Sequence, residues 1–206
     1  MSGQAGSKHT PIYLDTAEAV ASFVRSIADT GIIALDTEGA SFHRFVDRIY
    51  LLQLSTREKS AVIDPLPIGS PAELGALLED RNVEIVFHDA DYDLRLLHQD
   101  YGWTVRRVFD TRVAAQLVGL KAFGLAALLE KYFDVKLDKK HQRADWSMRP
   151  LTRAPCCANA AAGNASSTTA AASIKTRNCM RTSERLSASS RCCSSRFFSS
   201  ATLASA

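Results

Sequence analysis

The first 152 residues of this 206-residue chain contain no cysteine, and all five cysteines lie between residues 153 and 206. They form an odd set that includes two adjacent pairs: Cys156, Cys157, Cys179, Cys192 and Cys193. This spacing fits neither a disulfide framework nor the C-x-x-C pattern of a zinc site. The cysteines therefore argue against a redox or zinc-binding role.

Long hydrophobic runs are absent as well. No apolar run approaches the roughly 18 residues that a membrane span needs, and residues 1–10 lack the apolar centre of a signal peptide. We therefore expect a mobile N-terminus over residues 1–10, no membrane association and a cytoplasmic location. The hydrophobic content of 46% and charged content of 23% are those of a globular protein with one or two domains.

The last quarter of the chain lacks Asp, Tyr, Trp and His, and it consists mainly of Ala, Ser, Thr, Arg and Cys. It holds seven of the 25 Lys and Arg residues but one of the 22 Asp and Glu residues. The formal charge of +3 therefore comes from this tail, and it does not mark the remainder as a basic nucleic-acid binder. We predict a folded domain over residues 11–152 and a low-complexity tail over residues 153–206.

The most informative stretch is an apolar run that begins after Gly31 and ends in Asp36-Thr37-Glu38. Its length and its boundaries predict a buried strand. Side chains alternate along a strand, so Asp36 and Glu38 share a face with Cα atoms roughly 6.6 Å apart. Two carboxylates on one face repel each other, and Mg²⁺ or Mn²⁺ would relieve that repulsion. The alternative is a solvated strand end, which is the commoner explanation of an isolated D-x-E.

A second acidic cluster follows the apolar strand predicted at residues 83–87. It opens a helix, where a carboxylate in the first turn is stabilised by about 0.3–1 kcal/mol. Capping is thus a fair explanation for Asp89 or Asp91. Asp93 is expected one turn deeper, where capping explains it less well, so it is a candidate third carboxylate.

The loop over residues 39–48 places aromatic and cationic side chains beside the first acidic pair: Phe42, Arg44, Phe45 and Arg48. Aromatic rings stack on bases and guanidinium groups hold phosphates, so this is a candidate substrate loop. Packing of Phe42 and Phe45 under the loop is an equal alternative.

The remaining periodicity predicts strands and helices in a mixed order. We expect strands at residues 12–14, 49–54, 60–63 and 105–109, and helices following Asp15 or Thr16, Pro71, Asp89, Thr111 and Gly124. The polar turn at residues 56–59 predicts a hairpin that joins the acidic strand in a meander. The fold class is therefore α/β or α+β with a partly antiparallel sheet.

Five motifs, taken in order, resemble ribonuclease D and related DEDD 3′-5′ exonucleases. They are Asp36-Thr37-Glu38, Gln53-Leu54, His88 with Asp93-Leu94, Asp110-Thr111, and the segment from Leu137 to Thr152 that contains Asp145-Trp146 and Arg149-Pro150-Leu151-Thr152. The resemblance implies an RNase H-like mixed sheet flanked by helices. It also implies removal of nucleotides from the 3′ end of RNA or DNA with two divalent metal ions, and RNA is favoured over DNA as the substrate.

The same resemblance implies roles for single residues. Asp36, Glu38 and Asp93 become catalytic metal ligands, whereas His88 and Asp110 become supporting residues. Trp146 is expected to be a packing anchor. His88 and the loop residues are further candidate substrate contacts. The basic residues of the last segment are expected either to hold phosphates or to form a solvated face: Lys139, Lys140, Arg143 and Arg149.

The family's third motif, a Tyr or His followed by an Asp, has no counterpart after Thr152, where Glu184 is the single remaining acid. The domain is therefore expected to be incomplete at its C-terminus, with an incomplete two-metal site and impaired activity. The alternatives are a catalytically degenerate nucleic-acid-binding module and, ranked last, an interaction domain without a nucleic-acid role.

The abrupt change of composition after Thr152 suggests a shifted reading frame. Translation of the gene in the other two frames just past the Thr152 codon is expected to give a Tyr-x-x-x-Asp pattern. Sequencing of the gene checks this. Absence of the pattern from both frames would leave residues 153–206 as a genuine low-complexity tail, disordered because it has few large apolar residues.

Overall fold

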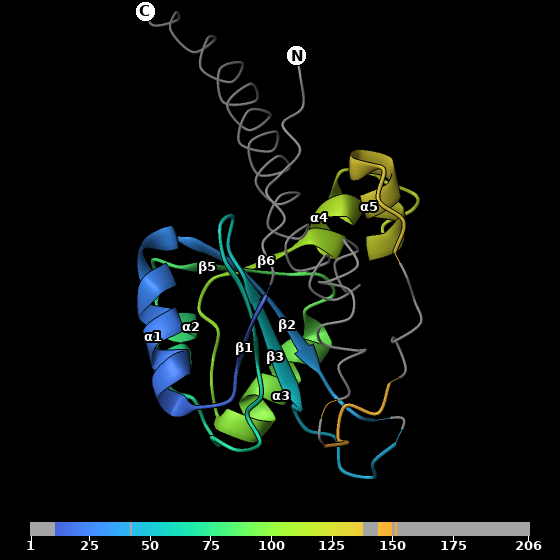
Figure 1. Ribbon diagram of the computed structural model, residues 1–206. Coiled ribbons are helices and arrows are strands. Elements are labelled where there is room, and N and C mark those ends of the chain that lie inside the picture. Colours follow the sequence, from blue (N-terminus) through green and yellow to red (C-terminus); the bar gives the residue numbers. More distant parts are fainter. Residues whose placement is uncertain (1–10, 42, 138–143, 150, 152–206) are drawn as a thin grey trace, which may run out of the picture.

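A computed structural model of the chain describes residues 11–41, 43–137, 144–149 and 151. The predicted 1–10 terminus and 153–206 tail lie outside them. Six strands of the described part form one sheet in the order β1-β4-β3-β2-β5-β6 (Figure 1). Their bounds are β1 Ile12–Leu14, β2 Ile32–Glu38, β3 Leu51–Ser55, β4 Ser60–Ile63, β5 Glu84–Phe87 and β6 Val108–Asp110.

The sheet is mixed, as the sequence predicts. Strands β2, β3 and β4 form an antiparallel meander, and β1 lies parallel to β4. Strands β5 and β6 continue from the other edge of β2 in parallel pairings. The acidic strand β2 is therefore an interior strand, flanked by β3 and β5.

Five α-helices are described: α1 Ala17–Ile27, α2 Ala72–Glu79, α3 Asp91–Tyr101, α4 Thr111–Leu117 and α5 Leu125–Phe133. Thr16 caps α1, because its Oγ1 accepts a hydrogen bond from the Ala19 N–H at 3.3 Å. A short 3₁₀ turn then leads to Gly31, whose φ of +69° suits glycine. Both features were predicted from the sequence.

Two local predictions are wrong at the β6–α4 junction. The strand begins at Val108 rather than at residue 105. The N-cap of α4 is Asp110 rather than Thr111, because the Asp110 carboxylate accepts from the backbone N–H groups of Arg112 and Val113. Asp and Thr are both good caps, so the sequence alone did not distinguish them.

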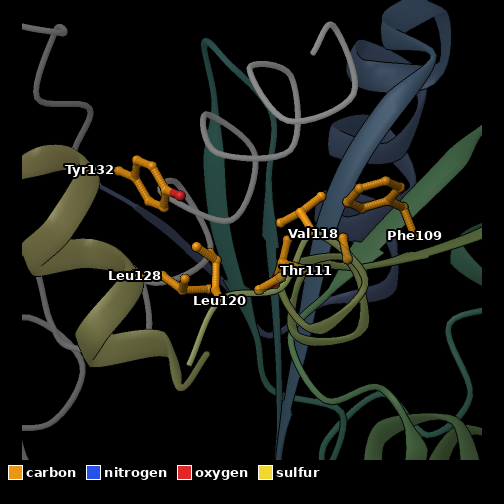
Figure 2. Close-up of a pocket in the computed structure, with 8 residues that line it drawn as sticks. Phe109, Thr111, Val118, Leu120, Leu128 and Tyr132 are labelled. Carbon is orange, nitrogen blue, oxygen red and sulfur yellow. The ribbon is translucent and has the colours of Figure 1, made fainter. Parts of the chain in front are cut away.

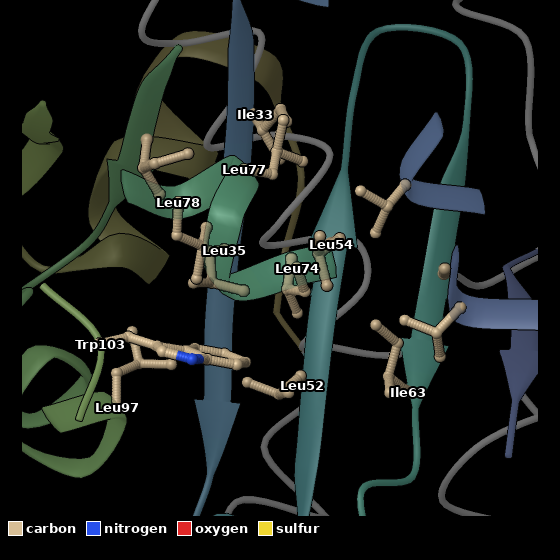
Figure 3. Packing of buried hydrophobic residues seen from close by; sticks show 14 of the residues in the cluster. Ile33, Leu35, Leu52, Leu54, Ile63, Leu74, Leu77, Leu78, Leu97 and Trp103 are labelled. Atoms are coloured by element: carbon tan, nitrogen blue, oxygen red, sulfur yellow. The ribbon is translucent and has the colours of Figure 1, made fainter. Parts of the chain in front are cut away.

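Helices α1, α2 and α3 cover one face of the sheet and enclose the main core (Figures 1 and 3). The predicted apolar stripe of α1, which includes Val20 and Val24, is buried there. Ile33 and Leu35 of β2 point into the same core, and burying each such side chain contributes about 1.5–3 kcal/mol. Alternation along β2 therefore directs Asp36 and Glu38 to the opposite face.

That opposite face carries two smaller apolar clusters. Ala34 and Val86 form one of them, and partly buried Phe109 packs against it. Tyr50 and Trp146 belong to the other. Helices α4 and α5 lie next to each other on the far side of the sheet from α1 and α2 (Figure 1).

An aromatic pair, Tyr101 and Trp103, packs in the main core against α2. The rings of Tyr101 and Trp103 lie 4.4 Å apart between centroids, and the Trp103 ring is packed directly against Gly75 of α2. A Cβ atom at Gly75 would lie 2.4 Å from Trp103 Nε1 and 2.6 Å from Cε2. Glycine at this position is therefore required by contact with a buried ring.

Gly75→Ala is expected to destabilise the protein, although the same change in a free helix stabilises by about 1 kcal/mol. Overpacking against Trp103 costs about 1–3 kcal/mol and reverses the sign. Urea denaturation measures the change. Gly124→Ala is the control, because nothing lies within 4 Å of its added Cβ; an equal or larger loss there would contradict the explanation.

Candidate functional site

The end of β2 presents two half-buried carboxylates, Asp36 and Glu38. Gln53 of β3 pairs directly with Asp36 across the antiparallel ladder. Its Nε2 donates a hydrogen bond of 2.8 Å to Glu38 Oε1, the diagonal neighbour on the same face. The glutamine thus holds one of the two carboxylates from the neighbouring strand.

Asp93 approaches the same strand end from α3. Its carboxylate is 5% exposed, and Oδ1 accepts hydrogen bonds from the Thr37 N–H at 2.9 Å and the Thr37 hydroxyl at 2.8 Å. Thr37 lies between Asp36 and Glu38, so α3 is bonded to the strand at the residue between the two predicted carboxylate ligands. Asp93 lies in the first turn of α3, one turn earlier than expected, but these bonds reach β2 instead of capping its own helix.

The described residues do not form a complete metal-binding site. Across residues 11–41, 43–137, 144–149 and 151, no three His, Cys, Asp or Glu side chains are gathered closely enough to hold an ion. Asp93 Oδ1 is instead directed at Thr37. The ligand roles of Asp36, Glu38 and Asp93 therefore remain predictions.

The loop that follows β2 is fastened to α3. The Tyr92 hydroxyl donates a hydrogen bond to the Asp47 carboxylate, which also accepts from the Ala40 N–H at 3.1 Å. Gln99 Nε2 donates to the Asp47 carbonyl oxygen at 2.7 Å. Burial, and then the bond to Asp47, raise the pKa of Tyr92 to about 12. The helix that carries Asp93 therefore also sets the course of this loop.

The candidate substrate residues of this loop have different environments. Phe45 is fully exposed, so the alternative that it packs beneath the loop is wrong. Arg44 Nε donates to Ser147 Oγ at 2.7 Å, and Arg48 lies 5.9 Å from the centroid of the Tyr50 ring. Phe42 lies outside the described residues. Among the described residues of this loop, Phe45 therefore presents its aromatic ring to solvent.

Of the four basic residues predicted as phosphate contacts after Leu137, the structure describes Arg149. Lys139, Lys140 and Arg143 lie outside the described residues. Arg149 holds Asp64 through bonds of 2.8 and 2.9 Å, and its other N–H groups reach the carbonyl oxygens of Trp146, Met148 and Tyr50. It is therefore a structural clamp, and both the phosphate and solvated-face interpretations of Arg149 are wrong.

Trp146 is 5% exposed and packs in the cluster with Tyr50. The prediction that it is a packing anchor is confirmed. Together with the Arg149 clamp, it fixes the described segment at residues 144–149 to the sheet face that carries the carboxylates.

His88 and Asp110 both take part in local hydrogen bonding. The Thr111 hydroxyl donates to the Phe87 carbonyl at 3.0 Å, so it accepts the 2.8 Å bond from His88 Nδ1, and that nitrogen carries the proton. Asp110 accepts from backbone N–H groups of the loop before α3 and of α4. Burial alone would raise the pKa of Asp110, but these donors hold it below its usual value.

A shallow pocket lies elsewhere, between β6, α4 and α5 (Figure 2). Its lining is mostly apolar and includes Phe109, Val118, Leu128 and Tyr132. None of the predicted metal ligands lines it. The chemistry of the acidic strand end is therefore not associated with this pocket.

Several site residues were not assigned a role from the sequence. Thr37 and Gln53 lie inside sequence motifs that give them no role of their own, and the bond between Tyr92 and Asp47 has no signal in the sequence. Strand alternation across a hairpin could have placed Gln53 beside Asp36, because the register follows from the hairpin turn.

In the described part of the chain, no helix is both long and apolar enough to cross a membrane.

Comparison with known proteins gives a consistent family. A family model described as 3′-5′ exonuclease matches residues 11–158. The exosome complex exonuclease RRP6 of Saccharomyces cerevisiae is 35% identical over 144 residues, which cover 69% of this chain and 20% of that protein. Ribonuclease D of Cronobacter turicensis is 35% identical over 144 residues, covering 69% of this chain and 39% of that protein.

A solved structure shares the fold. The crystal structure of Escherichia coli RNase D, titled an exoribonuclease involved in structured RNA processing, matches with a TM-score of 0.68 and 30% identity. The match covers 82% of this chain and 46% of that one. This chain thus spans less than half of each of these relatives.

The bidentate pair between Arg149 and Asp64 yields a pH prediction. Burial opposes ionisation of Asp64, but bonds from Arg149 and Tyr13 lower its pKa in the folded protein. This contribution is therefore present above the unfolded pKa, near 4, and is lost as pH falls through the lower folded pKa. Asp64→Asn is expected to cost about 3 kcal/mol at pH 6, because it leaves Arg149 without its counter-charge.

Urea unfolding from pH 6 to pH 2 tests this expectation. The stability difference between wild type and Asp64→Asn should shrink below about pH 4. Asp29→Asn, at an exposed position, is the control and should run parallel to wild type. A difference for Asp64→Asn that stays constant down to pH 2 would contradict the assignment.

Proposed function

The chain belongs to the 3′-5′ exonuclease family, and from that premise we propose that its folded domain hydrolyses phosphodiester bonds at the 3′ end of RNA. The observation that carries the proposal is the meeting of Asp93 with the Asp36-Thr37-Glu38 strand end through Thr37. This contact joins the helix that carries Asp93 to the strand end that carries Asp36 and Glu38, and it supports the proposal that the three carboxylates act together.

The residues at this place fit a divalent cation. All three proposed ligands offer oxygen atoms, which Mg²⁺ and Mn²⁺ prefer. Gln53 Oε1, on the same face, is a buried oxygen with no hydrogen-bond partner in the described part of the chain. A site that supplies anionic oxygens and an unused acceptor suits a hydrated cation.

Asp36, Glu38 and Asp93 would hold the metal ions. Bound there, two cations would supply an activated water and compensation of charge on the attacked and leaving oxygens. Thr37 would fix Asp93 through its N–H and hydroxyl groups, and Gln53 would fix Glu38.

The substrate would be held beside this strand end by the loop that α3 fastens. Phe45 offers an exposed ring on which a base can stack, and Arg44 and Arg48 offer positive charge. Lys139, Lys140 and Arg143 are proposed phosphate contacts by family resemblance. His88 is proposed as a support for the site through its bond to Thr111, rather than as a direct contact.

RNA is the proposed substrate because the relatives include an exoribonuclease and an exosome exonuclease. A role in RNA processing and a cytoplasmic location belong to the same proposal. Because this chain spans only part of those proteins, their whole activity and their partners are not transferred to it.

We also propose that the activity of this chain is impaired. Residues after Thr152 supply one acid, Glu184, and no Tyr or His that could serve as the third motif. This observation favours a second candidate function, a nucleic-acid-binding module without turnover. Salt-dependent RNA affinity in the absence of product would distinguish it from the enzyme.

Asp36→Asn is expected to reduce residual nuclease activity by more than about 100-fold, because losing a metal ligand should exceed the 10–100-fold effect of losing an outer-shell partner. A 5′-labelled single-stranded RNA, incubated with Mg²⁺ or Mn²⁺, should shorten from its 3′ end. EDTA should abolish the shortening. Asp29→Asn, which is exposed, is the matched control.

Equal turnover by Asp36→Asn and wild type would overturn the assignment of the site. If the wild type binds RNA at saturating Mn²⁺ but does not shorten it, the result would instead favour the nucleic-acid-binding module.

A further inference from the structure

Gln53 is a polar side chain at a position where the surrounding strand is buried. It is 3% exposed, and its neighbours Leu52 and Leu54 are fully buried in the core on the other face. Alternation places Gln53 on the face of Asp36, with which it pairs across the ladder. An apolar residue would satisfy burial here, so the amide needs another explanation.

The amide has a fixed orientation. An ionised Glu38 can only accept hydrogen bonds, so the Gln53 nitrogen must face it, as the 2.8 Å bond from Nε2 to Glu38 Oε1 shows. The amide oxygen then points away from Glu38. In the described part of the chain, this Oε1 is the one buried side-chain oxygen or nitrogen that has no partner.

A buried carbonyl oxygen without a donor is unfavourable, because it has lost its hydrogen bonds to bulk water. Asp36, which pairs with Gln53 across the ladder, and Glu38 on the same face are carboxylates, and carboxylates are acceptors when ionised. They cannot serve Oε1. A water molecule held at this site would supply the missing donor.

We propose that Gln53 is a positioning residue of the metal site. Its Nε2 orients the Glu38 carboxylate, and its Oε1 accepts a hydrogen bond from a water molecule carried by the bound cation. Mg²⁺ keeps several of its waters when it binds to proteins, and a metal-bound water is a strong donor. This inference rests on the proposed function, because it assumes a cation at Asp36 and Glu38.

Ser55 provides a matched comparison on the same strand. It is two residues from Gln53, on the same face and 1% exposed, and its hydroxyl is paired with Ser60 Oγ at 3.0 Å. Ser55 thus has a polar group that is satisfied within the protein. Replacing it should alter folding stability without altering the affinity for a cation.

The experiment measures Mn²⁺ binding to the full chain by isothermal titration, and thermal unfolding with EDTA or with Mn²⁺. Wild type, Gln53→Met, Gln53→Glu, Ser55→Ala and Asp36→Asn are compared. Gln53→Met keeps the side-chain length but removes both polar atoms, so Mn²⁺ affinity is expected to fall about 10–100-fold. Ser55→Ala should bind Mn²⁺ as wild type does.

Thermal unfolding gives a second measurement that does not depend on activity. The Tm deficit of Gln53→Met should widen in Mn²⁺, because wild type gains more from binding. The deficit of Gln53→Glu should narrow, because a cation relieves the repulsion between its new carboxylate and Glu38. A purely structural role for Gln53 predicts that both deficits stay the same with and without Mn²⁺.

The possible failures can be told apart. If wild type binds Mn²⁺, Asp36→Asn does not, and Gln53→Met matches wild type, the role of Gln53 is overturned while the proposed metal site stands. If wild type neither binds Mn²⁺ nor is stabilised by it, both the metal site and the role of Gln53 are overturned.

Discussion

The site depends on one buried contact, the pair of hydrogen bonds that Thr37 gives to Asp93. A carboxylate that is 5% exposed is costly unless donors compensate it, and the N–H and hydroxyl of Thr37 do so within 2.9 Å. The contact joins the first turn of α3 to the end of β2. It therefore helps to fix the acid of the helix relative to the strand that carries Asp36 and Glu38.

The same helix organises the surrounding loop. Tyr92 and Gln99 of α3 hold Asp47, and Asp100 accepts a bond of 2.7 Å from the Ile49 N–H. These residues span about two turns of α3, so one rigid element places both the carboxylate of Asp93 and the loop beside it. A family of nucleases needs such a scaffold, because the metal ligands and the substrate loop must keep their relative positions.

A second set of contacts secures the face of the sheet on which Asp36 and Glu38 lie. Arg149 clamps Asp64 at the end of β4, and Trp146 fills the apolar cluster beside Tyr50. One of these residues, Arg149, was a candidate phosphate contact in the sequence motif. In this protein, the guanidinium of Arg149 donates its hydrogen bonds to Asp64 and to backbone carbonyl oxygens.

The sequence by itself determined the elements and the side on which the acids lie. The apolar run before Asp36, the stripe on α1 and the glycine at residue 31 all act through neighbouring residues, so their physics is local. The D-x-E pattern fixed a shared face for Asp36 and Glu38 for the same reason. The five motifs, in their order along the chain, also indicated the 3′-5′ exonuclease family.

Only the tertiary structure decided how distant residues meet. The bond between Asp93 and Thr37 joins positions 56 residues apart, and the clamp between Arg149 and Asp64 joins positions 85 residues apart. Such contacts depend on strand register, helix placement and burial together, and no local pattern carries that information. The unsatisfied oxygen of Gln53 belongs to this class, because burial and the absence of a partner exist only once the chain has folded.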